Sequence, residues 1–302
     1  MSTPSFSPLR ALAFLLGAQV FLAVLDASSK WLAADMGIPL IAAVRHGTQV
    51  VLMLAVLGPR LRGRLWRTRR PFEQVARGLV LGAFSLTFVS SLRYLPQAEA
   101  TAIIFVGPLV VMLLAGPLLG ESVGRVRWVG AVAGFLGMLV VVRPGGTLAP
   151  LGIAFGVLAI ACNVAFQLLT RRLAVADEAM TTLFISALSA ALLSAVLLPW
   201  QDAWGGWPDA LGSGQVATLL ALGVLGALGQ WLLLRAFFWA GASFLAPLSY
   251  LQLWWSGLTG WWFFGQVPDG LSAAGMVLIA ASGIGVMGWE ARAARRGRDE
   301  RR

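Results

Sequence analysis

Long apolar stretches, separated by short polar or arginine-rich segments, dominate the pattern of hydrophobic and polar positions along the chain. Each stretch has roughly 20 residues, the length that a helix needs to cross about 30 Å of hydrocarbon. Short alternating segments, which would indicate a membrane β-barrel, do not occur. The pattern predicts an all-α membrane protein with ten transmembrane helices. These helices are expected over residues 9–29, 38–58, 74–92, 97–119, 126–143, 149–170, 180–199, 214–237, 242–265 and 270–289.

The composition supports a chain that is surrounded by lipid. Hydrophobic residues make up 58% of the 302 positions and charged residues 12%, with a mean hydropathy of +0.80. A soluble globule of this size would need more polar surface. The 35 glycines fit the same picture, because small residues let transmembrane helices approach closely. We expect this packing within a monomer, although the same faces would serve a homodimer.

The 23 Lys and Arg residues give a net charge of +10. They do not form the basic face with interleaved aromatic residues that nucleic-acid binding requires, so nucleic acid is not an expected partner. Nearly all lie beside the ends of apolar stretches on one predicted side, as in residues 58–71 and the tail 291–302. Because such residues are retained in the cytoplasm, the sequence predicts a multi-pass inner (plasma) membrane protein with both termini cytoplasmic. Membrane lipids are expected partners, including anionic head groups near residues 58–71.

An internal repeat divides the chain into two halves. The segment Leu118-Leu119-Gly120-Glu121 matches Phe263-Phe264-Gly265-Gln266, and the same offset places Gly130 on Gly275. Since each half holds five predicted helices, an odd number, the second half must enter the membrane in the opposite sense. We therefore predict inverted five-helix repeats over 1–145 and 146–290 around a central cavity, followed by a basic cytoplasmic tail over 291–302.

Short motifs extend the likeness between the halves and to other proteins. The first half contains Ala98-Glu99-Ala100-Thr101-Ala102, Pro108, Gly120-Glu121, Arg127-Trp128-Val129-Gly130 and Arg143-Pro144-Gly145; the second contains Ala246 to Gln252 and Phe264 to Asp269; Asp26, Lys30-Trp31 and Arg45 precede them. Together they resemble the EamA-type ten-helix members of the drug/metabolite transporter superfamily, over nearly the whole chain. The sequence departs from that family at Gln266, where Glu is common, and His46 matches no family pattern.

The resemblance implies a secondary active transporter that works by alternating access, as an exporter or an exchanger. Its substrates would be small organic metabolites such as amino acids, organic anions or drugs. Protons or a counter-solute would be the coupling partner. The resemblance does not select among these substrates.

Motifs for other chemistry do not occur in the sequence. We find no G-x-x-x-x-G-K-[ST] loop for ATP, no H-E-x-x-H and no G-x-S-x-G. With one His and one Cys, Cys162, neither a metal site nor a conventional catalytic triad is expected, nor is any cofactor. The chain is therefore predicted not to be an enzyme. Two alternatives stay open: an intramembrane transferase that uses Asp26 or Glu99, and a lipid scramblase.

Ionisable residues within predicted membrane helices are candidates for substrate binding or coupling, because each is costly there unless paired or hydrated. Asp26 and Lys30 are four residues apart and can form an ion pair, which would either neutralise itself or take part in gating. Arg45 could bind a carboxylate or phosphate, or instead lock its helix to Asp26. His46 could couple proton movement, or be a neutral hydrogen-bonded residue. Glu99 is expected to pair with Arg93 or to select substrate.

Aromatic and amide side chains form a second group of candidates. Tyr250, Gln252 and Trp254 combine hydrogen-bonding groups with aromatic faces in the ninth predicted helix. Asn163 lies in the sixth predicted helix and Trp231 in the eighth. Both are candidates for substrate binding, and contacts between helices are their alternative role. Finally, Pro108 and Pro247 remove backbone donors at similar places in the two halves, which predicts helix hinges or static kinks.

Overall fold

A computed structural model describes residues 8–119, 125–143, 146–173, 177–208, 211–239, 245 and 248–299. All regular secondary structure in these ranges is helical, which confirms the all-α prediction. Pro247 lies outside the described residues, as do Gly120-Glu121 and Pro144-Gly145. The helices are α1 (Pro8–Leu32), α2 (Ile38–Leu61), η1 (Arg62–Trp66), α3 (Pro71–Tyr94), α4 (Gln97–Ile104), α5 (Gly107–Leu119), α6 (Arg125–Val142), α7 (Pro150–Leu173), α8 (Ala179–Val196), η2 (Leu198–Trp204), α9 (Ser213–Trp239), α11 (Leu251–Phe264) and α12 (Gly270–Asp299).

Local sequence explains several of the helix ends. Proline opens α3 and α7, where its missing N–H would have no partner in any case. The Asp269 side chain caps α12, since its Oδ1 accepts a 2.8 Å hydrogen bond from the Ser272 N–H. Gly265 ends α11 with a left-handed φ of 64°, and the next residue, Gln266, donates its N–H back to the Gly260 carbonyl.

Seven of the described helices are long and apolar enough to cross a membrane: α1, α2, α3, α7, α8, α9 and α12. Two shorter apolar segments, 97–111 and 128–142, lie among them. The predicted single helix over 97–119 is wrong in detail, because a turn at Phe105 and Val106 separates α4 from α5. Pro108 has no N–H to donate to the Ile104 carbonyl, which weakens the helix at this point and favours the break, although α2 continues through Pro59.

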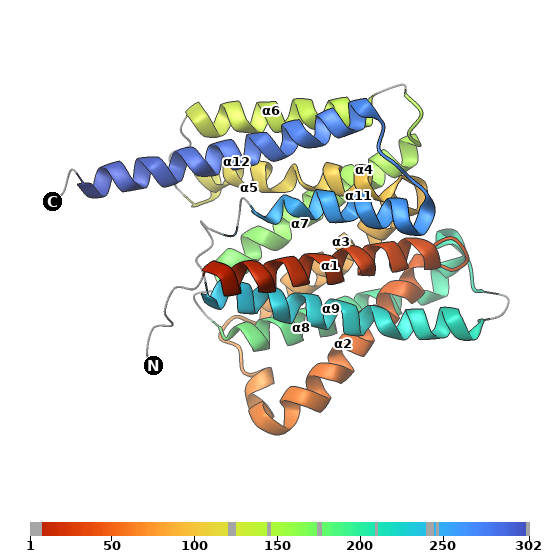
Figure 1. Ribbon diagram of the computed structural model, residues 1–302. Coiled ribbons are helices and arrows are strands. Elements are labelled where there is room, and N and C mark those ends of the chain that lie inside the picture. Colours follow the sequence, from red (N-terminus) through yellow and green to blue (C-terminus); the bar gives the residue numbers. More distant parts are fainter. Residues whose placement is uncertain are drawn as a thin grey trace.

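Most of the helices run roughly along one direction and form one bundle, which α2 crosses obliquely (Figure 1). The start of α1 and the end of α12 lie at the same end of the bundle, on the left of Figure 1, which we call the proximal end. The opposite, distal end holds the end of α1, the end of α3 and the start of α12. Helices α6 and α12 lie together along one edge, and α2 lies at the opposite edge.

Packing between helices follows a repeated scheme. The contact between α1 and α9 has a counterpart in the contact between α7 and α3. In the same way, the contact between α2 and α9 has a counterpart in the contact between α8 and α3. The short helices match too, since η1 contacts α8 and η2 contacts α2. Helices α6 and α12 cross at Gly137 and Gly275, where a Cβ on either would come within 2.9 Å of the other's carbonyl oxygen. The glycine faces expected from the sequence therefore serve packing within one chain at this crossing.

Candidate functional site

Two helix interruptions meet in the middle of the chain's fold. One is the turn between α4 and α5, and the other is the turn at Tyr250 that precedes α11. The rings of Phe105 and Tyr250 contact each other across the gap, with centroids 5.4 Å apart. Interrupted helices leave backbone groups unpaired, and in membrane proteins such backbone is tolerated where it is buried in protein or lines a cavity. This junction is therefore a candidate centre of function.

Asn163 is one of the predicted residues that lie at this junction. Its side chain accepts a 2.9 Å hydrogen bond from Gln167 Nε2. Both amides lie beside Gly107, at 3.9 to 4.0 Å from where its Cβ would be. Helix α7 thus presents two amide groups to the start of α5, immediately before Pro108.

Tyr250 is buried at the same junction but points toward α12. Its hydroxyl lies directly against Gly283, where a side chain could not fit, and makes no hydrogen bond. The ring packs within the apolar core that includes Ile103 and Ile279. In this conformation Tyr250 packs against α12, and its hydroxyl is an unpaired buried group.

A polar face of α1 runs beside this junction, with residues 19, 23, 26 and 30 on one side of the helix. Gln19 Nε2 donates to the Leu248 carbonyl at 2.9 Å, and Gln97 Nε2 of α4 donates to the Ala23 carbonyl at 3.0 Å. Since carbonyls can only accept, these bonds fix the orientation of both amides. Their Oε1 atoms therefore remain as free acceptors, buried and unpaired.

Helix α11 adds two more buried polar atoms without a hydrogen bond, Gln252 Oε1 and Ser256 Oγ. They share a helix face with Gly260, whose Cβ would lie 3.6 Å from Gln97 Cβ. Helices α1, α4 and α11 contact one another, so this face lies at their junction. Leaving such a group unpaired costs about 1–3 kcal/mol, and a solute with N–H or O–H groups would relieve it. We call this set the acceptor cluster: Gln19, Gln97, Gln252 and Ser256.

The expected ion pair between Asp26 and Lys30 does not form. Lys30 Nζ instead donates to the Leu92 carbonyl at 2.6 Å and to the Leu95 carbonyl, at the end of α3, and lies 5.5 Å from the Phe264 ring centroid. Carbonyls at a helix C-terminus carry partial negative charge and compete well for an ammonium group. Asp26 and Lys30 have the spacing that an ion pair requires, but the carbonyl groups at the end of α3 bind the Lys30 ammonium group instead.

Asp26 has Arg45 of α2 as its charged neighbour, and the two attract each other without closing to a 4 Å ion pair. The Arg45 guanidinium lies between α2 and α9, with its Nε 4.0 Å from where a Cβ of Gly226 would be. His46 is buried, and neither ring nitrogen makes a hydrogen bond of standard geometry, although Gln49 interacts with the ring. The structure thus places Asp26 next to Arg45. His46 follows Arg45 along α2 and makes no hydrogen bond of standard geometry to either residue.

Glu99 and Arg93 also have different partners from those expected. Glu99 is buried and interacts with Ser272 at the start of α12, whereas Arg93 Nη1 donates to the Trp204 carbonyl at 3.0 Å. Beside Glu99, Arg143 Nη2 contacts both carboxylate oxygens of Asp269, at 2.7 and 2.8 Å. The Ser272 N–H and the Arg143 guanidinium lower the pKa of the Asp269 carboxyl to about 2.

The two predicted tryptophans lie away from the acceptor cluster. Trp254 is 64% exposed and borders an apolar groove of 630 Å³ between α11 and α12. Trp231 borders a separate cavity of 440 Å³ between α2, α8 and α9, together with Gln49 and Gln230. The structure therefore does not gather all the predicted site residues in one place.

Sequence reasoning missed the role of several polar residues near the proximal end. The sequence patterns assign Arg77 no role beyond its positive charge, yet it is 4% exposed and hydrogen-bonds to Thr170 and Ser186. Gln74 and Asp177 are joined in the same region by a 2.8 Å hydrogen bond. The position of these residues could have indicated a buried role, because Gln74 and Arg77 are one turn apart and fall inside the apolar stretch of α3.

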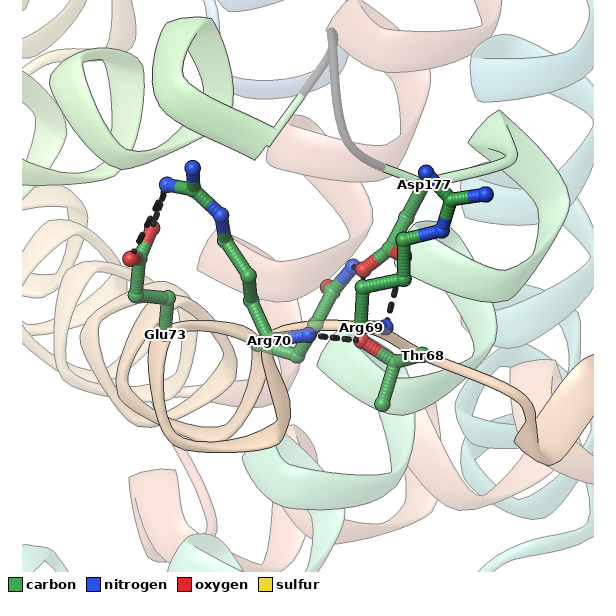
Figure 2. Close-up of polar contacts among 6 residues, drawn as sticks. Thr68, Arg69, Arg70, Glu73 and Asp177 are labelled. Carbon is green, nitrogen blue, oxygen red and sulfur yellow. Dashed lines mark hydrogen bonds and ion pairs between the residues drawn. The ribbon is translucent and has the colours of Figure 1, made fainter.

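Asp177 is the anchor of this region (Figure 2). It accepts hydrogen bonds from the Arg69 N–H at 2.9 Å and from the Thr68 hydroxyl, as well as from Gln74. Desolvation raises the pKa of the Asp177 carboxyl, but these hydrogen bonds outweigh that effect and hold the pKa below its ordinary value. A nearby exposed pair, Arg70 and Glu73, closes at 3.1 Å.

Comparison with known proteins identifies the family of the chain. Residues 9–143 match the model of the EamA-like transporter family. The riboflavin transporter of Vibrio cholerae is 28% identical, covering 97% of both chains. The S-adenosylmethionine uptake transporter of Rickettsia conorii is 30% identical over 70% of both, and the pseudopaline exporter CntI of Pseudomonas aeruginosa is 29% identical over 70% of this chain and 72% of its own.

A solved crystal structure, 22% identical, has the same fold, with a TM-score of 0.62 over 93% of this chain and 99% of its own. The range matched by the family model includes Asp26, Pro108 and Arg143. The chain belongs to the EamA-like transporter family, within the drug/metabolite transporter superfamily.

Proposed function

We propose that this protein is a secondary active transporter that moves a small organic metabolite across the inner membrane by alternating access. The observation that carries the proposal is the acceptor cluster at the junction of α1, α4 and α11, directly beside two interrupted helices. In secondary transporters, substrate sites lie near the middle of the membrane and are formed by interrupted helices. That the relatives are named as transporters supports the same function.

The proposed architecture is a pair of inverted five-helix halves, 1–145 and 146–290. The repeated packing scheme supports it, since α1 on α9 and α3 on α7 are equivalent contacts under an inverted repeat. The positions of Lys and Arg support a cytoplasmic proximal end, because residues 58–71 and the end of α12 both lie there. One half would then rock against the other around the acceptor cluster.

The substrate class that fits best is a solute with several N–H or O–H groups. Three amide oxygens of the acceptor cluster, on Gln19, Gln97 and Gln252, are hydrogen-bond acceptors that require donors from the solute. Riboflavin and S-adenosylmethionine, named for two relatives, both carry such donors. Exchange against protons or a counter-solute, with export as the net direction, is the transport mode that we propose.

Transport in proteoliposomes tests this function. We expect saturable movement of radiolabelled riboflavin or S-adenosylmethionine that responds to a pH gradient or to trapped counter-solute. Gln97→Leu combined with Gln252→Leu should lower the initial rate by about thirtyfold, because each of the two lost hydrogen bonds is worth about 1 kcal/mol. Gln230→Leu, an amide outside the acceptor cluster, is the matched control and should leave the rate unchanged.

Three results would contradict the proposal. The Gln97→Leu, Gln252→Leu double variant could transport normally, which would remove the acceptor cluster from the path. Product formation in detergent without a membrane would favour an intramembrane transferase. Lipid movement between leaflets without saturable solute movement would favour a scramblase.

A further inference from the structure

The same glutamine–aspartate contact occurs at both ends of the bundle. At the proximal end, Gln74 Nε2 of α3 donates to Asp177 Oδ2 at 2.8 Å. At the distal end, Gln215 Nε2 of α9 donates to Asp35 Oδ2 at 3.1 Å. The two aspartates are separated by 142 positions and the two glutamines by 141, close to the spacing of the internal repeat. Each contact joins residues from different halves of the chain.

The proximal contact is the more heavily reinforced one. Asp177 also accepts hydrogen bonds from the Thr68 hydroxyl and the Arg69 N–H, which ties the segment after η1 to the segment before α8 (Figure 2). Gln74 is fully buried and donates a second bond, of 2.9 Å, to the Thr182 hydroxyl of α8. The Asp177 carboxylate is itself only partly buried, so the strength of this contact comes from the number of charge-assisted hydrogen bonds that it accepts.

Arg77, one turn further along α3, strengthens the same end. Its Nε donates to Thr170 Oγ1 of α7 at 2.8 Å, and its Nη1 donates to the Ser186 hydroxyl of α8. The guanidinium also lies 4.2 Å from the Phe166 ring centroid. One side chain therefore holds α3 to α7 and α8, which belong to the other half. The position that corresponds to Arg77, one turn after Gln215, holds Thr218, whose short side chain carries no charge.

The distal contact is open to water. Asp35 is exposed, and from the described residues its carboxylate accepts only the bond from Gln215. Gln215 is itself partly exposed and accepts a 3.2 Å bond from the Gly212 N–H. Exposed polar contacts contribute little, because water replaces them at small cost. The two ends thus share one geometry but differ in strength.

We infer that Gln74 and Asp177, supported by Arg77, form the latch of a gate at the proximal end, and that Gln215 and Asp35 form its weaker distal counterpart. The inference rests on the alternating-access function proposed above. For a solute to leave or enter at the proximal end, α3 must separate from Asp177 and from α8. The proximal latch would therefore hold the protein closed at that end until it is broken.

Distances between spin labels, measured by pulsed electron paramagnetic resonance in lipid nanodiscs, test this inference. Each protein for this experiment has Cys162 replaced by Ala and carries one pair of spin labels at two exposed positions. Phe72→Cys with Arg172→Cys reports the proximal end, and Ala34→Cys with Ser213→Cys reports the distal end. No solute is added, so the result does not depend on whether the protein transports any particular compound.

Asp177→Ala should increase the ratio of long to short proximal distances by roughly tenfold, the change expected from losing a charge-assisted hydrogen bond. The distal distances should not lengthen, because alternating access opens only one end at a time. The matched variant Asp35→Ala should change the distal ratio by less than about twofold, since its contact is exposed. Asp177→Asn keeps one acceptor oxygen and should give an intermediate proximal ratio, and it serves if Asp177→Ala does not fold.

The inference is overturned if the folded Asp177 variants keep the wild-type proximal distances. It is also overturned if Asp177→Ala and Asp35→Ala each lengthen the distances at both ends, because both aspartates would then stabilise the fold without regard to side. Loss of transport with unchanged distances would count against the latch while leaving the proposed function intact. If the wild type transports no solute but the variants show the expected distance shifts, the latch would be supported and the proposed function would not.

Discussion

At the scale of single residues, buried cations in this protein are held mainly by neutral oxygen atoms. Lys30 donates to backbone carbonyls at the end of α3, and Arg77 donates to hydroxyl groups of α7 and α8. Such partners satisfy the donors without placing a second full charge in a poorly hydrated environment, where a charge is expensive. They also leave the carboxylates Asp26 and Glu99 without a direct partner among the lysine and arginine side chains of the described residues. We therefore propose these two carboxylates as positions where a solute or a proton binds.

Asp269 gives a prediction for the dependence of stability on pH. Its pKa is about 2 in the folded protein and about 3.9 in an unfolded chain, so the folded state favours the charged form. The stability that the Asp269 charge gains from the Ser272 N–H and from Arg143 is therefore present above about pH 4 and is lost as the pH falls toward 2. Asp269→Asn keeps the cap on Ser272 and removes only the charge.

Thermal unfolding in detergent, scanned from pH 6 down to 2, measures this contribution. We expect the wild type to unfold at a higher temperature than Asp269→Asn at pH 6, and the difference to shrink as the pH falls toward 2. Because the pair is largely exposed, the difference should be small and should decrease further in high salt. A difference that grows at low pH would mean that the Asp269 charge destabilises the folded state through other neighbours.

At the scale of elements, the break between α4 and α5 is the feature that links sequence to movement. Pro108→Ala restores an N–H that can bond to the Ile104 carbonyl, so the turn at Phe105 should become more helical. We expect slower hydrogen exchange over residues 103–110 and a loss of transport rate of about tenfold if the break acts as a hinge. Pro150→Ala is the control, since proline at the first position of α7 blocks no bond. A normal transport rate with slowed exchange would show that the kink is static.

The limits of prediction are clearest at this scale. Apolar runs predicted where α1, α2, α3 and α7 lie, because length and hydropathy are local properties of the sequence. Pro108 indicated a hinge or a kink within one helix but not the full break at Phe105, since a proline near a helix start and one inside a helix look alike in sequence. Candidate residues such as Asn163 and Gln252 were found from residue type alone. Their partners, and the unpaired state of Gln252, depend on which helices meet in three dimensions.

At the scale of the whole molecule, contacts between the proposed halves bind the bundle together. Helix α1 packs on α9, α3 packs on α7 and α8, and α6 packs on α12. Each of these joins residues 1–145 to residues 146–290, whereas contacts within the first half, such as α1 with α3, are less extensive. The helices of one half thus bury their polar and small-residue faces against the other half. A half by itself would expose Gln74, Arg77 and Gln97 to lipid.

Separate expression of the halves turns this packing into a test. Residues 1–145 alone should insert into the membrane but aggregate in mild detergent, because unsatisfied polar groups in lipid cost several kcal/mol each. Co-expressed with residues 146–302, the same fragment should elute as a single monodisperse complex on size-exclusion chromatography. Arg77→Leu, which removes bonds to both α7 and α8, should weaken that complex, whereas Arg70→Leu should not, since the Arg70 guanidinium pairs with Glu73 in the same half. A first half that is monodisperse alone would mean that the five helices form an independent unit, and the rocking of one half against the other would then need a different interface.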